Sequence, residues 1–262
     1  MSGSIRLSTI WPRVASNSLI IVGFIAVWQI LVATLKLPTA LFPSPYAVWI
    51  ALVQLAAVGF SNTPLSTHIL VSMVRILSGY LLGFVVGVPF GFLMGYSPVM
   101  QRAITPFIAL MRPLPAFAYV AVLIVWFGIG EIAKVLIVFV GASTILALST
   151  TDGVLRVPPV YRDAGRALGA NWMQVLINIT LPAALPQILD GARVALAQSW
   201  TCVIAAEFVA ASAGIGVIVL QSADYMRTDQ TVAGLILLGI IGGVTDRLLA
   251  IAQHPVAAWR IR

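Results

Sequence analysis

Two charged residues, Arg112 and Glu207, fall inside long apolar stretches of this sequence and are the side chains best placed to do chemistry there. A charge at membrane depth is expensive, so it normally faces a water-filled cavity or a partner. Arg112 either lines a solute pathway, where it would favour an anion, or lies near the cytosolic interface and anchors its span. The carboxylate of Glu207 needs a partner in the same way. Both are candidate substrate-path residues.

The other reactive side chains exclude several classes of protein. His68 and His254 are far apart and have no partner at metal-ligand spacing, so we expect no metal site. Cys202 is the single cysteine, so a disulfide within the chain is impossible. Neither Lys36 nor Lys134 follows a glycine, so the P-loop of ATPases is absent. With no nucleophile–base pair either, we expect no catalysis. Any ATP must be hydrolysed on another chain.

The composition is that of an integral membrane protein. The chain has 262 residues, of which 60% are hydrophobic and 9% charged, and its mean hydropathy is +1.04. A soluble domain carries about 25% charged residues. Because a bilayer demands internal hydrogen bonding of the backbone, the expected fold is all-α. The net charge of +7 is explained by arginines that flank the spans on the cytosolic side, so we expect no nucleic-acid partner.

Six transmembrane helices are expected within a single domain, residues 1–262. The first, uncleaved span covers about 19–35, a short interfacial helix covers 46–60, and the remaining spans lie between about 68 and 252. Prolines 106, 113 and 115 should break the third span. The basic residues predict that both termini lie in the cytosol. The inner ones are Arg6, Arg13, Arg102, Arg156, Arg162, Arg166, Arg260 and Arg262, and the outer ones are Lys36, Lys134 and Arg227.

Several local features follow from this topology. Residues 97–105 and 212–230 are expected to be loops. Arg75, in the outer part of the second span, is expected to snorkel to the interface rather than pair within the bundle. Asp190 and Arg193, three residues apart, are expected to neutralise each other on one helix face.

Five glycines recur every four residues along the second expected span. Small residues allow another helix backbone to approach closely. The helix that packs there belongs either to a second copy of the chain or to the same chain, and the sequence leaves both open. The glycines are Gly79, Gly83, Gly87, Gly91 and Gly95.

Residues 161–182 form the most polar long segment of the chain and predict two short amphipathic helices hinged at Gly169. In the first helix, Tyr161, Ala164 and Leu168 share a face. The second is amphipathic through Trp172, Val175, Leu176 and Ile179, and Pro182 is expected to close it. Such a hairpin can dock into a groove of a soluble partner, or it can be a connector that lies against its own membrane domain.

The spacing of this segment is similar to the EAA signature of permease subunits of binding-protein-dependent ABC importers. That signature reads Glu-Ala-Ala, three residues, Gly, nine residues and Ile-x-Leu-Pro. Here it is matched by Asp163-Ala164-Gly165, Gly169 and Ile179-Thr180-Leu181-Pro182. Asp163 replaces the glutamate and Gly165 the second alanine. Gly165 should weaken the helix by up to about 1 kcal/mol relative to alanine.

The resemblance implies a type I ABC importer permease fold in the cytoplasmic (inner) membrane, with a cytosolic coupling helix that contacts the ATPase. It further implies a second copy of the chain, two ATPase subunits that hold ATP and magnesium, a periplasmic or lipid-anchored solute-binding protein, and membrane lipids. This chain itself would hold no cofactor. The downstream sequence resembles the nitrate, sulfonate and taurine branch.

The branch implies transport of a small anion such as nitrate, taurine, an alkanesulfonate or bicarbonate. A heterocyclic vitamin precursor is the alternative solute. The family has a glutamate in the Ala-Ala-Glu context of Glu207, which implies an internal structural or gating pair there, because a carboxylate would repel an anionic solute. The rival from another class is an ion-coupled secondary transporter, for which Glu207 would be the chief coupling residue; no inverted repeat is obvious.

Overall fold

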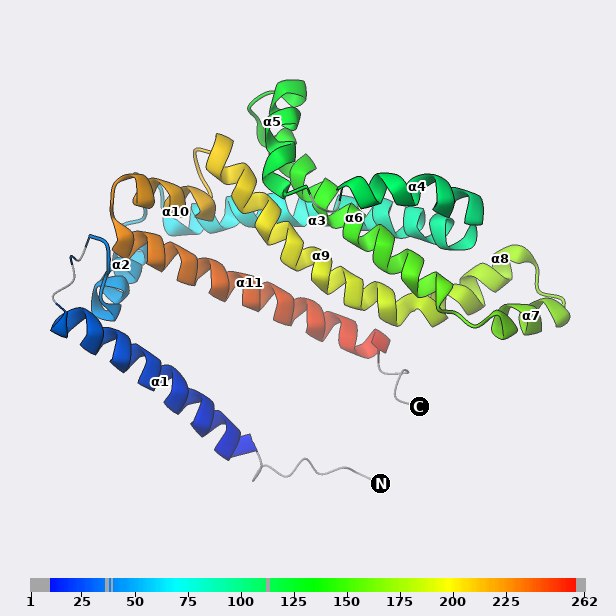
Figure 1. Ribbon diagram of the computed structural model, residues 1–262, viewed down its shortest axis with the longest axis horizontal. Helices are drawn as coiled ribbons and strands as arrows, with labels where there is room; N and C mark the ends of the chain where they lie inside the picture. The colour runs from blue at the N-terminus through cyan, green and yellow to red at the C-terminus, as the bar shows by residue number, and fades with distance from the viewer. Residues whose placement is uncertain (1–9, 36–37, 39, 112–113, 258–262) are drawn as a thin grey trace. The chain divides into compact units, whose positions relative to one another are not determined.

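The structure is a computed structural model that describes residues 10–35, 38, 40–111 and 114–257. Within these residues every regular element is helical, apart from one isolated bridge between Phe60 and Thr63. The chain divides into two compact units, residues 1–65 with 218–236 and residues 66–217 with 237–262. Figure 1 shows the helices in chain order. The all-α class expected from the sequence is confirmed.

The first unit holds α1 (Ile10–Thr34) and α2 (Pro45–Ala57), with parts of α10 (Ile215–Asp224) and α11 (Thr228–Ala257). Ser44 caps α2 because its Oγ accepts a hydrogen bond from the backbone N–H of Ala47 at 3.2 Å. Pro45 follows in the first turn, where its missing N–H costs nothing. The short helix expected at 46–60 is therefore confirmed as α2.

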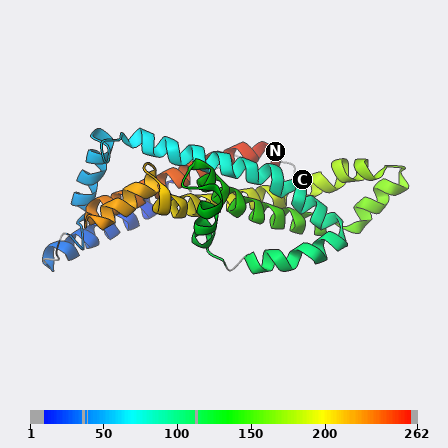
Figure 2. The same cartoon turned by 90° about the horizontal axis from the view of Figure 1, so that it is seen from above.

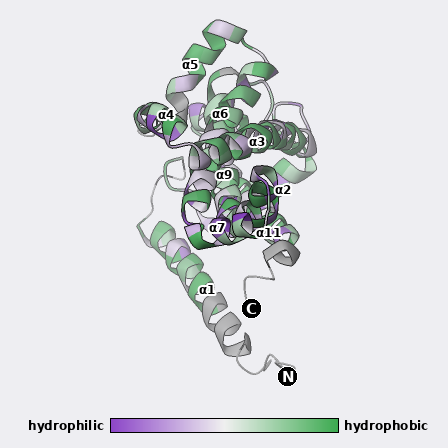
Figure 3. Ribbon diagram, turned by 90° about the vertical axis from the view of Figure 1, so that its right-hand side faces the viewer, coloured by the Kyte–Doolittle hydropathy of each residue, from purple (hydrophilic) through white to green (hydrophobic). Residues whose placement is uncertain are grey.

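The second unit contains the long core helices and the polar segment. Helices α6 and α9 run side by side in Figures 1 and 2, and Ile137, Leu146 and Val203 are among the fully buried side chains between the helices of this unit. Figure 3 shows hydrophobic ribbon along most helices and hydrophilic ribbon at α7. The elements are α3 (Leu65–Tyr96), α4 (Pro98–Met111), α5 (Ala116–Phe127), α6 (Glu131–Leu155), α7 (Pro159–Ala167), α8 (Trp172–Val175), the π-helix η2 (Leu176–Thr180), α9 (Leu181–Ala210) and the rest of α11.

Among the described residues, four helical stretches are long and apolar enough to cross a membrane. They are Leu65–Tyr96, Glu131–Leu155, Trp172–Val209 and Thr228–Gln253, which correspond to the second, fourth, fifth and sixth expected spans. The first expected span is represented by a shorter apolar stretch, Leu19–Thr34. The third is divided into α4 and α5, as expected from the prolines between them.

Two expected loops are wrong. Residues 98–105 belong to α4, because Pro98 is well suited to the first turn of a helix and Pro106 is accommodated inside it. Residues 212–230 contain α10, whose apolar residues Ile215 and Ile218 are almost fully buried. The polar residues of this stretch masked its apolar first half in the sequence.

The glycine ladder of α3 lies against α6 of the same chain. A Cβ atom at Gly83 would lie 2.8 Å from Ala142 Cβ, and one at Gly87 would lie 2.7 Å from the carbonyl oxygen of Ser143. Thr151 Oγ1 donates a hydrogen bond across this contact to the carbonyl oxygen of Gly91 at 3.0 Å. The close approach that the ladder permits is therefore used within the subunit.

Replacement of Gly87 by alanine is expected to lower the free energy of unfolding by about 1–3 kcal/mol, because the backbone of α6 must move to admit the methyl group. The matched control is Gly239→Ala in α11, where a Cβ meets nothing within 4 Å and helix propensity favours alanine by up to about 1 kcal/mol. Thermal unfolding of the purified variants measures both. Equal stability of Gly87→Ala and the unsubstituted protein would contradict the close packing.

Candidate functional site

The polar segment between α6 and α9 turns sharply at Gly169. This residue has φ +81°, in the left-handed region that favours glycine. The N–H of Ala170 donates to the carbonyl of Gly165 at 3.0 Å, and the N–H of Gly169 donates to that of Arg166 at 2.9 Å. These two bonds form a Schellman motif that ends α7. The hinge expected at Gly169 is confirmed.

The second helix of the segment begins with a capping box and continues into α9. Asn171 Oδ1 accepts from the N–H of Gln174 at 2.9 Å, and Gln174 Oε1 accepts from the N–H of Asn171 at 2.8 Å. The expectation that Pro182 closes this helix is wrong. Pro182 lies in the first turn of α9, after the π-helical turn η2, and helix persists over Trp172–Val209.

A groove of about 410 Å³ lies between α7 and η2. It exists because Gly165 is buried against η2: a Cβ there would overlap Ile179 Cδ1 and would lie 3.5 Å from Val175 Cγ2. The face shared by Tyr161, Ala164 and Leu168 is confirmed, because all three line this groove. Its lining is Tyr161, Ala164, Gly165, Leu168, Asn178, Ile179, Pro182 and Ala183.

The groove is open to a partner. Leu168 is 89% exposed beside the turn, and Asp163 is exposed as well. The shared face expected for the second helix is divided, since Trp172 and Leu176 line a separate apolar groove against α3 while Val175 is buried. A motif that is apolar, exposed and held by a fixed turn is suited to docking.

A buried ionic network lies at the other end of the bundle, around Arg75 and Glu207. Arg75 Nη1 donates to Glu207 Oε1 at 2.8 Å, and Ser72 Oγ donates to the same oxygen at 2.7 Å. The backbone N–H of Gly216 donates to Glu207 Oε2 at 2.8 Å. The side chain of Arg75 is 3% exposed and that of Glu207 is fully buried.

This network corrects one expectation and leaves Glu207 inside the protein. Arg75 does not snorkel, because a carboxylate lies within hydrogen-bond distance on α9 and a second one, Glu131, begins α6. Both oxygens of Glu207 are engaged by donors of its own chain. The geometry is that of an internal pair rather than a solute contact. Arg112, the other candidate substrate-path residue, lies outside the described residues.

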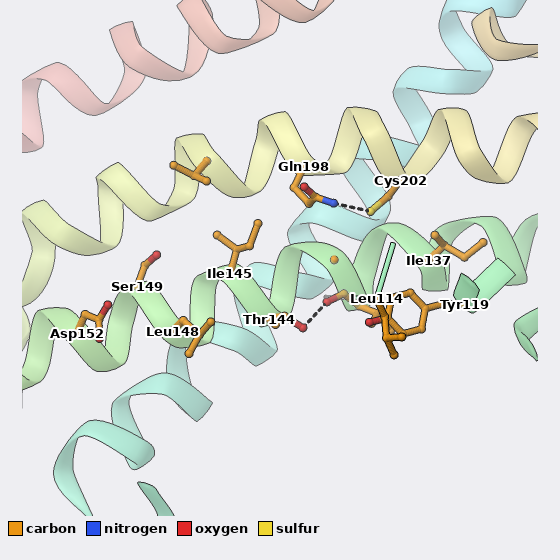
Figure 4. Close-up of a pocket in the computed structure, with 13 residues that line it drawn as sticks. Leu114, Tyr119, Ile137, Thr144, Ile145, Leu148, Ser149, Asp152, Gln198 and Cys202 are labelled. Carbon is orange, nitrogen blue, oxygen red and sulfur yellow. Dashed lines mark hydrogen bonds between the residues drawn. The ribbon is translucent and has the colours of Figure 1, made fainter. Parts of the chain in front are cut away.

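A cavity of about 340 Å³ lies between α5, α6 and α9 (Figure 4). Figure 4 shows Thr144, Ser149 and Asp152 on α6 and Gln198 and Cys202 on α9. Gln198 Nε2 donates a hydrogen bond to Cys202 Sγ at 3.7 Å. The polar residues that line the cavity are Tyr119, Thr144, Ser149, Asp152, Gln198 and Cys202.

The sequence reasoning missed this cavity. The sequence did contain an indication of the cavity. A glutamine at position 198 and hydroxyl side chains at positions 144 and 149 lie inside stretches that should otherwise be apolar. Their convergence on one cavity depends on how α6 and α9 are rotated against each other, which the sequence alone does not give.

Arg193 interacts with Asp190 through charge, as expected, and it also makes a tertiary contact. Arg193 Nη2 and Nε donate to the two carboxylate oxygens of Asp246 on α11, at 2.7 and 3.0 Å. The two side chains are 46% and 45% exposed. A two-bond fork of this kind adds geometric specificity to the ion pair.

Comparison with known proteins decides the family. Residues 87–254 match the family described as the binding-protein-dependent transport system inner membrane component. The chain belongs to this family. It is therefore the permease of a binding-protein-dependent ABC importer, a multi-pass protein of the inner membrane, and a secondary transporter is not favoured.

Curated relatives extend along nearly the whole permease. It is 35% identical over 259 residues to the taurine transport system permease protein TauC of Escherichia coli, which covers 97% of this chain and 94% of TauC. It is 28% identical to the putative aliphatic sulfonates transport permease protein SsuC of Bacillus subtilis, over 90% of this chain and 84% of SsuC. The nitrate import permease protein NrtB of Synechocystis is 28% identical over 94% of this chain and 90% of NrtB.

A solved structure shares the fold. The MetNI methionine ABC transporter in an inward-facing conformation contains a chain with a TM-score of 0.64 and 23% identity, which covers 73% of the permease and 95% of that chain. This agreement confirms the importer permease fold expected from the sequence.

Proposed function

We propose that this permease imports a small anion of the sulfonate or nitrate type. Support comes from the relatives named for taurine, aliphatic sulfonates and nitrate. The similarity to the taurine permease over 97% of the chain favours a small sulfonate. The choice among these solutes rests largely with a binding protein on the outer side.

The groove between α7 and η2 is the docking surface for the ATPase in this proposal. The observation that carries it is the packing of Gly165 on Ile179, because it brings the separated parts of the EAA-like motif together around one exposed groove. One such segment per chain calls for two copies of the permease and two ATPase subunits, which hold ATP and magnesium. The segment, and with it both termini, would lie in the cytosol.

The cavity between α6 and α9 lines part of the solute path in this proposal. α9 continues from the docking segment without a break, so a movement of that segment is transmitted along α9 to Gln198. ATP binding would then shift the permease between outward-open and inward-open states through different contacts in each. The hydroxyl and amide groups of the cavity would hydrogen-bond the passing solute.

Uptake by cells that express the complete importer tests this proposal. Taurine, ethanesulfonate and nitrate are offered in labelled form, and ATP-dependent uptake of at least one is expected. Gln198→Leu is expected to lower the rate about 3- to 10-fold, the loss of one hydrogen bond. The matched control, Gln54→Leu on α2, changes an exposed residue outside the cavity and should transport normally. Normal uptake by Gln198→Leu would remove the cavity from the path.

A further inference from the structure

Arg75 lies between the carboxylates of Glu131 and Glu207 and bonds each of them differently. Its Nε and Nη2 donate to Glu131 at 2.6 and 2.7 Å, in a two-bond fork, and its Nη1 donates to Glu207 and to the carbonyl of Ala213. Lys134 Nζ donates to the same Glu131 carboxylate at 2.9 Å. Glu131 is therefore paired with two cations at once, Arg75 and Lys134.

The exposure of these groups is strongly asymmetric. The side chains of Arg75 and Lys134 are 3% and 7% exposed, whereas that of Glu131 is 62% exposed. The carboxylate can leave into water at little desolvation cost, but the cations cannot follow it. Two cations and the remaining Glu207 carboxylate would leave a net charge of +1 at this point, which is a site for an anion.

The glycine turn directly before Glu131 has open space around it. Gly128 has φ +78°, and a Cβ atom built at either Gly128 or Gly130 would meet nothing within 4 Å. Glu131 is the first residue of α6, directly after this glycine turn. A rearrangement of the turn would thus disturb few contacts. Glu207, with bonds from Ser72 and Gly216, would keep Arg75 in place.

We propose that Arg75 and Lys134 form an anion-binding site that Glu131 caps in the state seen here, and that a small oxyanion displaces this carboxylate. The fork of Arg75 suits a carboxylate, a sulfonate or nitrate equally well, because each presents two oxygens side by side. The site lies at the N-terminal end of α6. The length of α6, about 36 Å, separates it from the opposite end of that helix, which leads into α7. The site deepens the proposed function, since it would be the first contact of an incoming anion with the permease.

Thermal unfolding of the full-length permease in detergent, without ATPase or binding protein, tests the site. Sodium ethanesulfonate, nitrate and acetate are compared with sodium chloride at constant ionic strength. A tethered carboxylate competes at an effective concentration in the mM range. Its removal in Glu131→Ala is expected to lower the oxyanion concentration for half-maximal stabilisation at least about tenfold. Glu131→Gln, which keeps the shape of the side chain, should shift it in the same direction.

Two further variants make the result specific. Adding Lys134→Ala to Glu131→Ala should abolish the fall in the oxyanion concentration for half-maximal stabilisation. Asp246→Ala releases Arg193 from a similar fork elsewhere in the unit and should show no comparable response. An equal response there, or no oxyanion effect beyond chloride in both Glu131 variants, would overturn the site. Because neither solute uptake nor ATP enters this measurement, its failure would leave the proposed import function standing, and failed uptake would leave the site standing.

Discussion

Replacement of Gly169 by tryptophan is expected to stop ATP-driven uptake while the permease remains inserted in the membrane. A side chain at φ +81° costs about 1–2 kcal/mol, which loosens the turn between α7 and α8. Nothing lies within 4 Å of a Cβ at this position, so the indole would project beside the exposed Leu168, at the rim of the groove. It would hold the ATPase away from the surface through which movement is transmitted.

Three quantities distinguish this uncoupling from misfolding: the amount of permease in the membrane, the ATPase that copurifies with it, and solute uptake. Gly169→Trp should leave the amount of permease in the membrane unchanged and should lose at least about 90% of solute uptake. Such a tenfold fall in rate corresponds to about 1.4 kcal/mol. Gly169→Asn is the matched control, because asparagine tolerates a left-handed backbone. Normal uptake by Gly169→Trp would count heavily against α7–η2 as the coupling contact.

Replacement of Glu207 by alanine should strongly destabilise the permease. It leaves the guanidinium of Arg75, 3% exposed, with one of its two carboxylates missing, and it removes the acceptor of Ser72 and of the Gly216 N–H. Loss of one partner of a buried ion pair costs about 3–5 kcal/mol. We expect a large fall in the unfolding temperature and little permease in the membrane.

The control is the exposed interhelical ion pair between Arg193 and Asp246. Asp246→Ala removes a carboxylate that accepts two bonds from Arg193, but there both partners are about half exposed and water can replace the lost contact. Its unfolding temperature should change little. A comparable fall in unfolding temperature in the two variants would mean that the burial of Glu207 does not determine its contribution to stability. Glu207→Gln, which keeps an acceptor for Ser72, should be intermediate.

Local sequence was sufficient wherever a structural property depends on neighbouring residues. The apolar stretches predicted helices because a bilayer leaves the backbone no other partner for its hydrogen bonds. Gly169 predicted a hinge because few other residues adopt positive φ at low cost. The spacing of Asp163, Gly169 and Pro182 led to the family, which the comparison of residues 87–254 then showed.

Only the tertiary structure decided which distant groups meet. Arg75 could have reached the membrane interface, but it pairs with carboxylates on two other helices. Arg193 interacts with Asp190 through charge, as expected, and also forms a fork with Asp246 on α11. The glycine ladder could have served a second copy, but its surface is filled by α6. The cavity around Gln198 needs two helices in a fixed rotation. Such pairings depend on the register between helices, and in a chain with so few charged residues one well-placed partner is enough to change where each charge lies.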